Sequence, residues 1–99
     1  MGRFNPIKEM LYAPQAVIAA NTPIDLGETW DMMEKLVQVV KFDLATATIT
    51  TLTIVDTTPA AGQIQLTDNK EIELGDATTA AEIYIIRYLP LGEVTKLVG

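Results

Sequence analysis

The chain lacks three residue types that carry out most enzyme chemistry, since it has no cysteine, no histidine and no serine. Without cysteine there is no disulfide, no thiolate nucleophile and no zinc ribbon. Without histidine there is no imidazole base or metal ligand, and no side chain that ordinarily titrates near neutral pH. Without serine there is no serine nucleophile. These absences exclude most catalytic classes, so we expect the protein not to be an enzyme and to use no cofactor.

Basic residues and long apolar runs are also scarce. Seven Lys and Arg stand against 13 Asp and Glu, which gives a formal charge of −6. We expect no nucleic-acid partner, because phosphate groups are neutralised by a basic face. We also expect no membrane partner, because no run approaches the roughly 18 apolar residues of a spanning helix. The expected location is a cytoplasm, or a particle that is assembled there.

Carboxylates are the remaining acid–base groups. Glu71 and Glu73 lie two residues apart on an expected strand, which places them about 7 Å apart on one face. Paired carboxylates hydrolyse glycosides, but alternation with Ile72 and Leu74 is more typical of a solvated strand face. A second acidic series recurs every three residues, and clustered carboxylates bind calcium. The members of this second series are Asp25, Glu28, Asp31 and Glu34. No calcium-loop motif accompanies them, so we interpret the series as a solvated face. We therefore predict no catalytic site and no metal site in the chain.

The 99 residues are 48 % apolar and 20 % charged, which is typical of one globular domain. Residues 1–24 hold three of the five prolines and a net charge of +1, whereas residues 25–99 carry −7. We therefore interpret 1–24 as an extended N-terminal arm with a short strand near 15–20, and 25–99 as a β-sandwich domain. The apolar side chains of the arm must pack, either on the same chain or on another subunit.

Alternating and β-branched segments, separated by turn signals, predict strands through most of the domain. The expected fold is all-β, an antiparallel sandwich of jelly-roll type with about seven or eight short strands. Residues 28–34 are expected to form a single helical turn or a wide loop. The predicted strands cover residues 36–44, 45–55 (one strand or two), 63–67, 71–74, 82–89 and 93–98.

The segment 82–89 is the strongest strand, and apolar residues on both its faces predict a central strand covered on both sides. Arg87 on this strand is expected to reach a carboxylate across the sheet. Residues 44–55 carry no charge, so an open edge there would aggregate. We expect an interior strand or an edge covered by a neighbouring subunit. The aromatic residues expected in the core are Phe42, Tyr84 and one or both of Trp30 and Tyr88.

A resemblance follows from these segments. The sequence PIDLG at 23–27, the uncharged Thr-rich strand and the closing YIIRYL at 84–89 resemble the small jelly-roll cement (decoration) proteins of tailed-phage heads. The likeness extends over about residues 15–90 and includes the acidic, cysteine-free composition. It implies a virion protein without an active site. Such proteins form homotrimers on the capsid surface, bridge subunits of the major capsid protein and are assembled in the host cytoplasm.

Aromatic and long apolar residues are enriched at interface hot spots, as is arginine. Two other functions remain open: another phage structural part (tail, baseplate or head–tail adaptor), or a cellular β-sandwich binding module. The candidate interface residues lie mainly in the arm and are Arg3, Phe4, Ile7, Met10, Leu11, Tyr12, Trp30 and Arg87.

Overall fold

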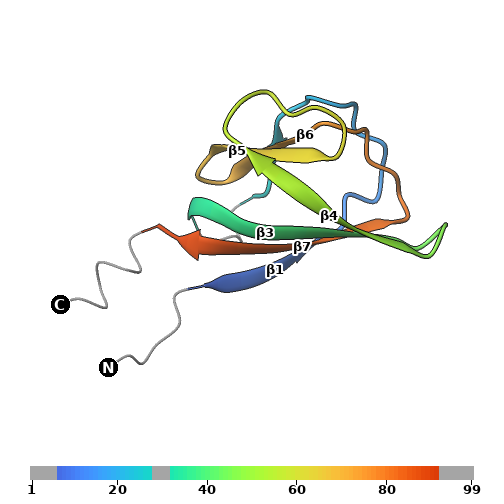
Figure 1. The fold of residues 1–99 in the computed structure, drawn as a ribbon, viewed down its shortest axis with the longest axis horizontal. Helices are drawn as coiled ribbons and strands as arrows, with labels where there is room; N and C mark the ends of the chain where they lie inside the picture. Colours follow the sequence, from blue (N-terminus) through green and yellow to red (C-terminus); the bar gives the residue numbers. More distant parts are fainter. Residues whose placement is uncertain (1–6, 28–31, 92–99) are drawn as a thin grey trace.

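The computed structural model describes residues 7–27 and 32–91, which contain seven strands and no helix (Figure 1). The expected all-β fold is therefore confirmed for the described part of the chain. The strands are β1 (Lys8–Tyr12), β2 (Ile24–Asp25), β3 (Met33–Asp43), β4 (Thr48–Val55), β5 (Gln63–Asp68), β6 (Glu71–Leu74) and β7 (Glu82–Pro90).

All seven strands belong to one curled sheet with the order β1-β7-β3-β4-β5-β6-β2. The first half of β4 pairs with β3, and its second half rises away to pair with β5 (Figure 1). β4 thus joins a lower layer, formed with β1, β7 and β3, to an upper layer, formed with β5, β6 and β2. The expected interior position of the uncharged strand is confirmed by the strand order, although β4 pairs with β3 only over residues 48–52 and with β5 only over residues 53–55.

The sheet is mixed and not purely antiparallel, because β4 and β5 run parallel. Parallel strands ordinarily need a crossover of a dozen or more residues. Here residues 56–62 alone connect β4 to β5, and the two strands form only three residue pairs. The Gly62 amide donates to Asp76 Oδ2 at 2.7 Å, and the Gln63 amide donates to the Ala60 carbonyl at 3.0 Å. The connection 56–62 packs closely against Gly75, because a side chain at Gly75 would collide with the Ala60 backbone.

The core lies between the two layers and takes side chains from the inward positions of almost every strand. The strongest alternation is on β7, where every second residue is buried. Tyr84 and Tyr88 are in the core as expected, at 2 % and 0 % exposure. The buried apolar residues are Ile24, Leu26, Met33, Leu36, Val39, Leu52, Ile64, Ile72, Leu74, Tyr84, Ile86 and Tyr88.

β7 is central, as expected, because β1 and β3 pair with its two edges. The expectation that both its faces are covered is wrong for the described residues. Ile83 and Ile85 are only half-buried, and the Arg87 side chain is 51 % exposed. Phe42, expected in the core, also lies half-buried on this second face. The upper layer covers one side of β7 only, and apolar composition alone does not show which side is covered.

The prediction of a strand near 15–20 is wrong, because these residues form no strand. The strand in the N-terminal region is β1, at Lys8–Tyr12. Pro14 cannot donate to a ladder, and Gln15 has a φ of 60°, which ends extended backbone. The following residues are held instead by Thr78, whose hydroxyl donates to the Ala16 carbonyl at 2.7 Å and accepts from the Ile18 amide at 2.8 Å. The described part of residues 1–24 therefore packs on its own chain.

The predicted boundary between the strands 36–44 and 45–55 lies within a turn. Residues 44–47 connect β3 to β4, with Ala47 at a φ of 56° and the Ala45 amide donating to Asp43 Oδ1 at 3.0 Å. β3 also begins earlier than expected, at Met33, so the described end of the predicted 28–34 loop or helical turn is strand. Residues 28–31, Trp30 among them, and the expected strand 93–98 lie outside the described residues.

Candidate interaction surface

The lower layer presents an outer face that is largely apolar. Its cross-strand register places Ile83, Phe42 and Ile49 side by side in one row. The adjacent row consists of Leu11, Ile85, Val40 and Thr51. Directly opposite residues in such pairs lie about 4.5–5.5 Å apart, so the two rows form one continuous surface. We call these seven residues the apolar rows.

The ends of the apolar rows are widely exposed. Leu11 on the edge strand β1 is 65 % exposed, Ile49 on β4 is 67 % exposed and Thr51 on β4 is also exposed, whereas the members on β3 and β7 are half-buried. Scattered apolar residues are normal at a surface, but a contiguous patch is typical of an interaction site. The apolar rows are therefore the candidate interaction surface of the described chain.

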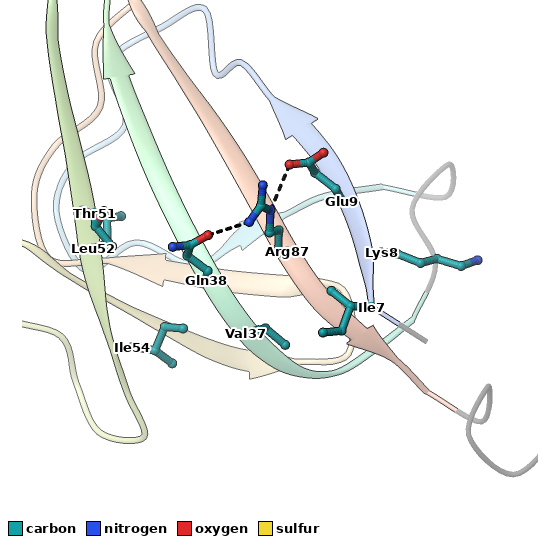
Figure 2. A pocket seen from close by; sticks show the side chains of 9 residues that line it. All are labelled: Ile7, Lys8, Glu9, Val37, Gln38, Thr51, Leu52, Ile54 and Arg87. Atoms are coloured by element: carbon teal, nitrogen blue, oxygen red, sulfur yellow. Dashed lines mark hydrogen bonds and ion pairs between the residues drawn. The ribbon is translucent and has the colours of Figure 1, made fainter. Parts of the chain in front are cut away.

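A polar row borders the apolar rows. Arg87 lies between Glu9 and Gln38 in the register, and its guanidinium donates to both: Nε to Glu9 Oε2 and Nη1 to Gln38 Oε1, each at 3.0 Å (Figure 2). The expected reach of Arg87 to a carboxylate across the sheet is confirmed. Both partners of the ion pair are 51 % exposed, so solvent screens it and its contribution to stability is small.

A groove of about 760 Å³ extends from the polar row toward β4 (Figure 2). Val37 on β3 and Ile54 on β4 stand on its two sides, and Ile7 and Arg87 form its β1–β7 end. Arg87 and its ion-pair partner Glu9 lie on the groove side of the sheet, whereas the Lys8 side chain points away from the other lining residues (Figure 2). The lining residues are Ile7, Lys8, Glu9, Val37, Gln38, Thr51, Leu52, Ile54 and Arg87.

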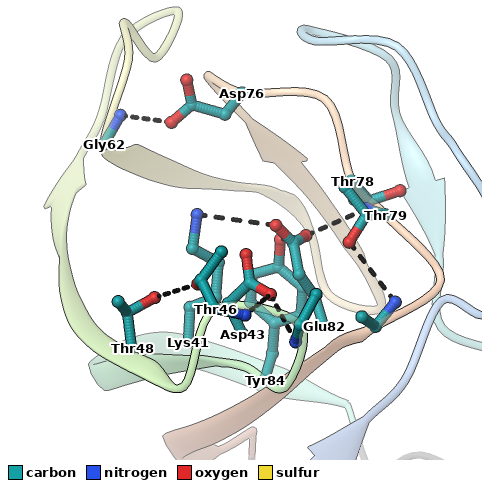
Figure 3. Close-up of polar contacts among 12 residues, drawn as sticks. Lys41, Asp43, Thr46, Thr48, Gly62, Asp76, Thr78, Thr79, Glu82 and Tyr84 are labelled. Atoms are coloured by element: carbon teal, nitrogen blue, oxygen red, sulfur yellow. Dashed lines mark hydrogen bonds and ion pairs between the residues drawn. The ribbon is translucent and has the colours of Figure 1, made fainter.

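A buried polar cluster lies at the opposite end of β7 (Figure 3). Glu82, 4 % exposed, accepts a hydrogen bond from the Tyr84 hydroxyl at 2.7 Å and one from the Thr79 amide at 3.1 Å. Its second oxygen is 3.7 Å from Lys41 Nζ. Burial and then the Glu82 carboxylate raise the pKa of Tyr84 above its ordinary value of 10.0. Because the contacts of Glu82 are internal, the cluster fixes the start of β7.

The predicted interface residues fall into three groups. Ile7, Leu11 and Arg87 lie together on the outer face or its groove. Met10 and Tyr12 are half-buried and pack against the core from the inward face of β1, where the Tyr12 and Tyr84 rings are 6.1 Å apart. Arg3, Phe4 and Trp30 lie outside the described residues.

The sequence reasoning missed the contribution of β3 and β4 to this surface. Val40 on β3 and Ile49 and Thr51 on β4 occupy outward positions, but none of them was among the predicted interface residues. The uncharged run at 44–55 was the available signal, because an uncharged strand with a bare outward face is typical of a surface that is covered by another molecule.

Two members of the carboxylate series accept hydrogen bonds from nearby groups of the same chain. Glu71 accepts a hydrogen bond from the Thr67 hydroxyl at 2.8 Å, and Asp25 accepts one from the Gly27 amide at 2.8 Å. Within residues 7–27 and 32–91, no three His, Cys, Asp or Glu side chains are grouped to hold a metal ion. The same residues include no helix with the length and hydrophobicity needed to cross a membrane.

Comparison with known proteins returned no matching family model, no similar curated protein and no similar solved structure.

Proposed function

We propose that this protein is a non-catalytic cement protein that attaches to the surface of a phage head and holds neighbouring major capsid subunits together. The observation that carries the proposal is the outer face of the lower layer. Its apolar rows span four strands, while the opposite face of the same strands already forms the core. A second apolar face on a layer of four strands supports attachment to another protein surface.

Association through this face is driven by burial of its apolar area, at roughly 25 cal/mol per Å². One small face gives modest affinity, because association costs translational and rotational freedom. A homotrimer that touches several capsid subunits at once raises the overall avidity by about 10²–10⁴ without new contacts. The jelly-roll likeness and the threefold symmetry belong to this proposal and rest on the resemblance of the sequence to cement proteins.

The polar row adds specificity to this attachment. Arg87, with its planar fork of donors, already holds Glu9 and Gln38 in place beside the apolar rows. Fixed polar groups at the rim of an apolar patch reject partners that leave them unpaired. The net charge of −6 keeps decorated particles from associating non-specifically.

The test replaces the two most exposed apolar side chains of the rows, in the double variant Leu11→Lys and Ile49→Lys. An unpaired charge buried in an interface costs about 3–5 kcal/mol, so affinity is expected to fall at least a hundredfold. Val17→Lys is the matched control, because Val17 is 75 % exposed and lies outside the lower layer. The readouts are the mass at sedimentation equilibrium and co-sedimentation with expanded phage heads whose major capsid gene neighbours the gene of this chain.

We expect the native protein and the Val17 variant to be trimers that saturate the heads in a fixed ratio. The double variant is expected to remain folded, with loss of both properties. A native protein that is monomeric and ignores the heads would overturn the proposal and leave a cellular binding module as the better description.

A further inference from the structure

β1 is an open edge of the sheet. It ends the strand order and pairs with β7 alone, through all five residues Lys8–Tyr12 and without a register shift. In the described chain, no strand lies on its other side. The N–H and C=O groups of alternate residues on such an edge point away from the neighbouring strand. The edge is therefore a template for pairing with another chain.

The second half of this edge has none of the features that prevent such pairing. Charges, prolines and bulges protect edge strands, but β1 contains no proline and its charged residues, Lys8 and Glu9, stand at its beginning. Met10, Leu11 and Tyr12 follow. Leu11 is 65 % exposed on the outer face, and the other two are half-buried against the core. Both faces of β1 are therefore apolar and incompletely covered at this end.

A second copy of the same chain fits this edge in one register. A twofold axis between two antiparallel β1 strands keeps their outer faces on the same side, so residues of one face lie opposite each other. Pairing centred on Glu9 opposes two carboxylates, which is destabilising, and pairing centred on Met10 opposes Glu9 with Leu11. Pairing centred on Tyr12 brings Pro14 into the ladder, where it cannot donate. Pairing centred on Leu11 opposes Leu11 with Leu11 and Met10 with Tyr12, so apolar groups meet on both faces.

The register centred on Leu11 also suits the surroundings of β1. It places Glu9 opposite Ala13, whose small side chain leaves room for the ion pair between Glu9 and Arg87. On the outer face, the apolar row that contains Leu11 continues into the same row of the second copy. The apolar rows of the two copies then form one surface of twice the area, on one side of a joint sheet.

We infer that β1 binds β1 of a second copy in antiparallel pairing centred on Leu11, so that two copies share one continuous sheet. The contact is a strip about 17 Å long, from five residues of strand, and about 10 Å high, from the thickness of a sheet layer. Its area is far below the roughly 800 Å² that each partner buries in a stable interface. The pairing is therefore weak in dilute solution and forms where copies are concentrated. It rests on the proposed function for its setting, since a head surface concentrates the copies, and it joins copies of neighbouring trimers.

Single cysteine variants report this pairing directly, because the chain has no cysteine of its own. Directly opposite residues have Cα atoms about 4.5–5.5 Å apart, which is within the range that a disulfide spans. We expect Leu11→Cys to form a disulfide-linked dimer at least tenfold faster than Val17→Cys, a control of similar exposure outside the lower layer. Non-reducing electrophoresis measures both rates over a concentration series that reaches the millimolar range.

A mixture of Glu9→Cys and Ala13→Cys tests the register. These two positions lie opposite each other in the inferred pairing, whereas two copies of either position are four residues, or about 13 Å, apart along the strands. We expect the mixed disulfide to exceed each symmetric disulfide at least tenfold, where random collision gives a ratio near two.

Equal rates for Leu11→Cys and Val17→Cys, or a mixed disulfide at the random ratio in the millimolar range, overturn the inference. The cysteine mixture is also measured on saturated phage heads. Heads that saturate normally while the mixed disulfide stays at the random ratio, in solution and on the heads, reject the pairing and keep the proposed function. An excess of mixed disulfide from a protein that ignores the heads keeps the pairing and rejects the proposed function.

Discussion

Two neighbouring isoleucines on β7 meet different environments. Ile86 is completely buried between the layers, whereas Ile85 is half-buried in the apolar rows. Both are isoleucines, they are adjacent in sequence, and both belong to the same central strand. The difference shows that one apolar face of the lower layer forms the core, and that the other is left uncovered by the described chain. The predictions below test this division of the two faces.

The largest expected effect comes from truncating these two side chains. Ile86→Ala is expected to lower the free energy of unfolding by about 2–5 kcal/mol, because it removes buried atoms and leaves a cavity. Ile85→Ala is expected to cost less than about 1 kcal/mol, because water or neighbouring side chains fill the space. Urea unfolding followed by circular dichroism measures both. If Ile86→Ala does not fold, Ile86→Val carries the comparison, at about 0.5–1.5 kcal/mol. Equal losses at the two positions would refute the division.

A smaller effect distinguishes the buried carboxylate of Glu82 from the exposed carboxylate of Glu9. Glu82→Gln removes a charge that is 4 % exposed and accepts from Tyr84 and Thr79, so unfolding is expected to become easier by about 1–3 kcal/mol. Glu9→Gln removes the half-exposed partner of Arg87 and is expected to cost at most about 1 kcal/mol. Thermal unfolding of both variants provides the comparison. A greater loss from Glu9→Gln would mean that the outer face stabilises the monomer.

The smallest effect is a pH dependence of stability that arises only in alkaline solution. Burial and Glu82 raise the pKa of Tyr84 in the folded protein, and burial raises that of Tyr12. The unfolded chain therefore loses these protons first, above its ordinary tyrosine pKa of 10.0. In that range the native state binds more protons, so the free energy of unfolding falls as pH rises. Below the ordinary pKa, the stabilisation is fully present.

Tyr84→Phe is expected to flatten this alkaline slope, while the slope that arises from Tyr12 remains. Urea unfolding from about pH 8 to about pH 11, with tyrosinate absorbance followed in parallel, measures the change. The variant also loses the hydrogen bond to Glu82, so its stability at neutral pH serves as the baseline. Identical slopes in the two proteins would show that Tyr84 titrates as if it were exposed.

The sequence was informative where one local rule decides the structure. Alternation at 63–67 and 71–74 predicted β5 and β6 closely, because a half-buried strand repeats every two residues. Alternation failed at 15–20, where Pro14 and the backbone of Gln15 end the extended chain. It also failed at the boundary between β3 and β4, because nothing in an uncharged run of Thr, Ala and Ile marks where a turn begins.

The candidate surface was predicted in part. Leu11 and Arg87 were identified from residue type, and both belong to the outer face or its polar border. Ile49 and Val40 were missed, because their neighbours across the sheet are far away in the sequence. Met10 and Tyr12 lie beside Leu11 in sequence but on the other side of β1. Face assignment in a strand depends on which side the rest of the chain covers.

Residue chemistry by itself determined that this protein is all-β and that its chain offers no cysteine, histidine or serine, because composition and two-residue periodicity are local properties. Only the tertiary structure decided the parallel pairing of β4 with β5, the divergence of β4 from β3 and the uncovered side of β7. These features depend on how strands distant in sequence are aligned, and alignment is set by the packing of the whole sheet around one core.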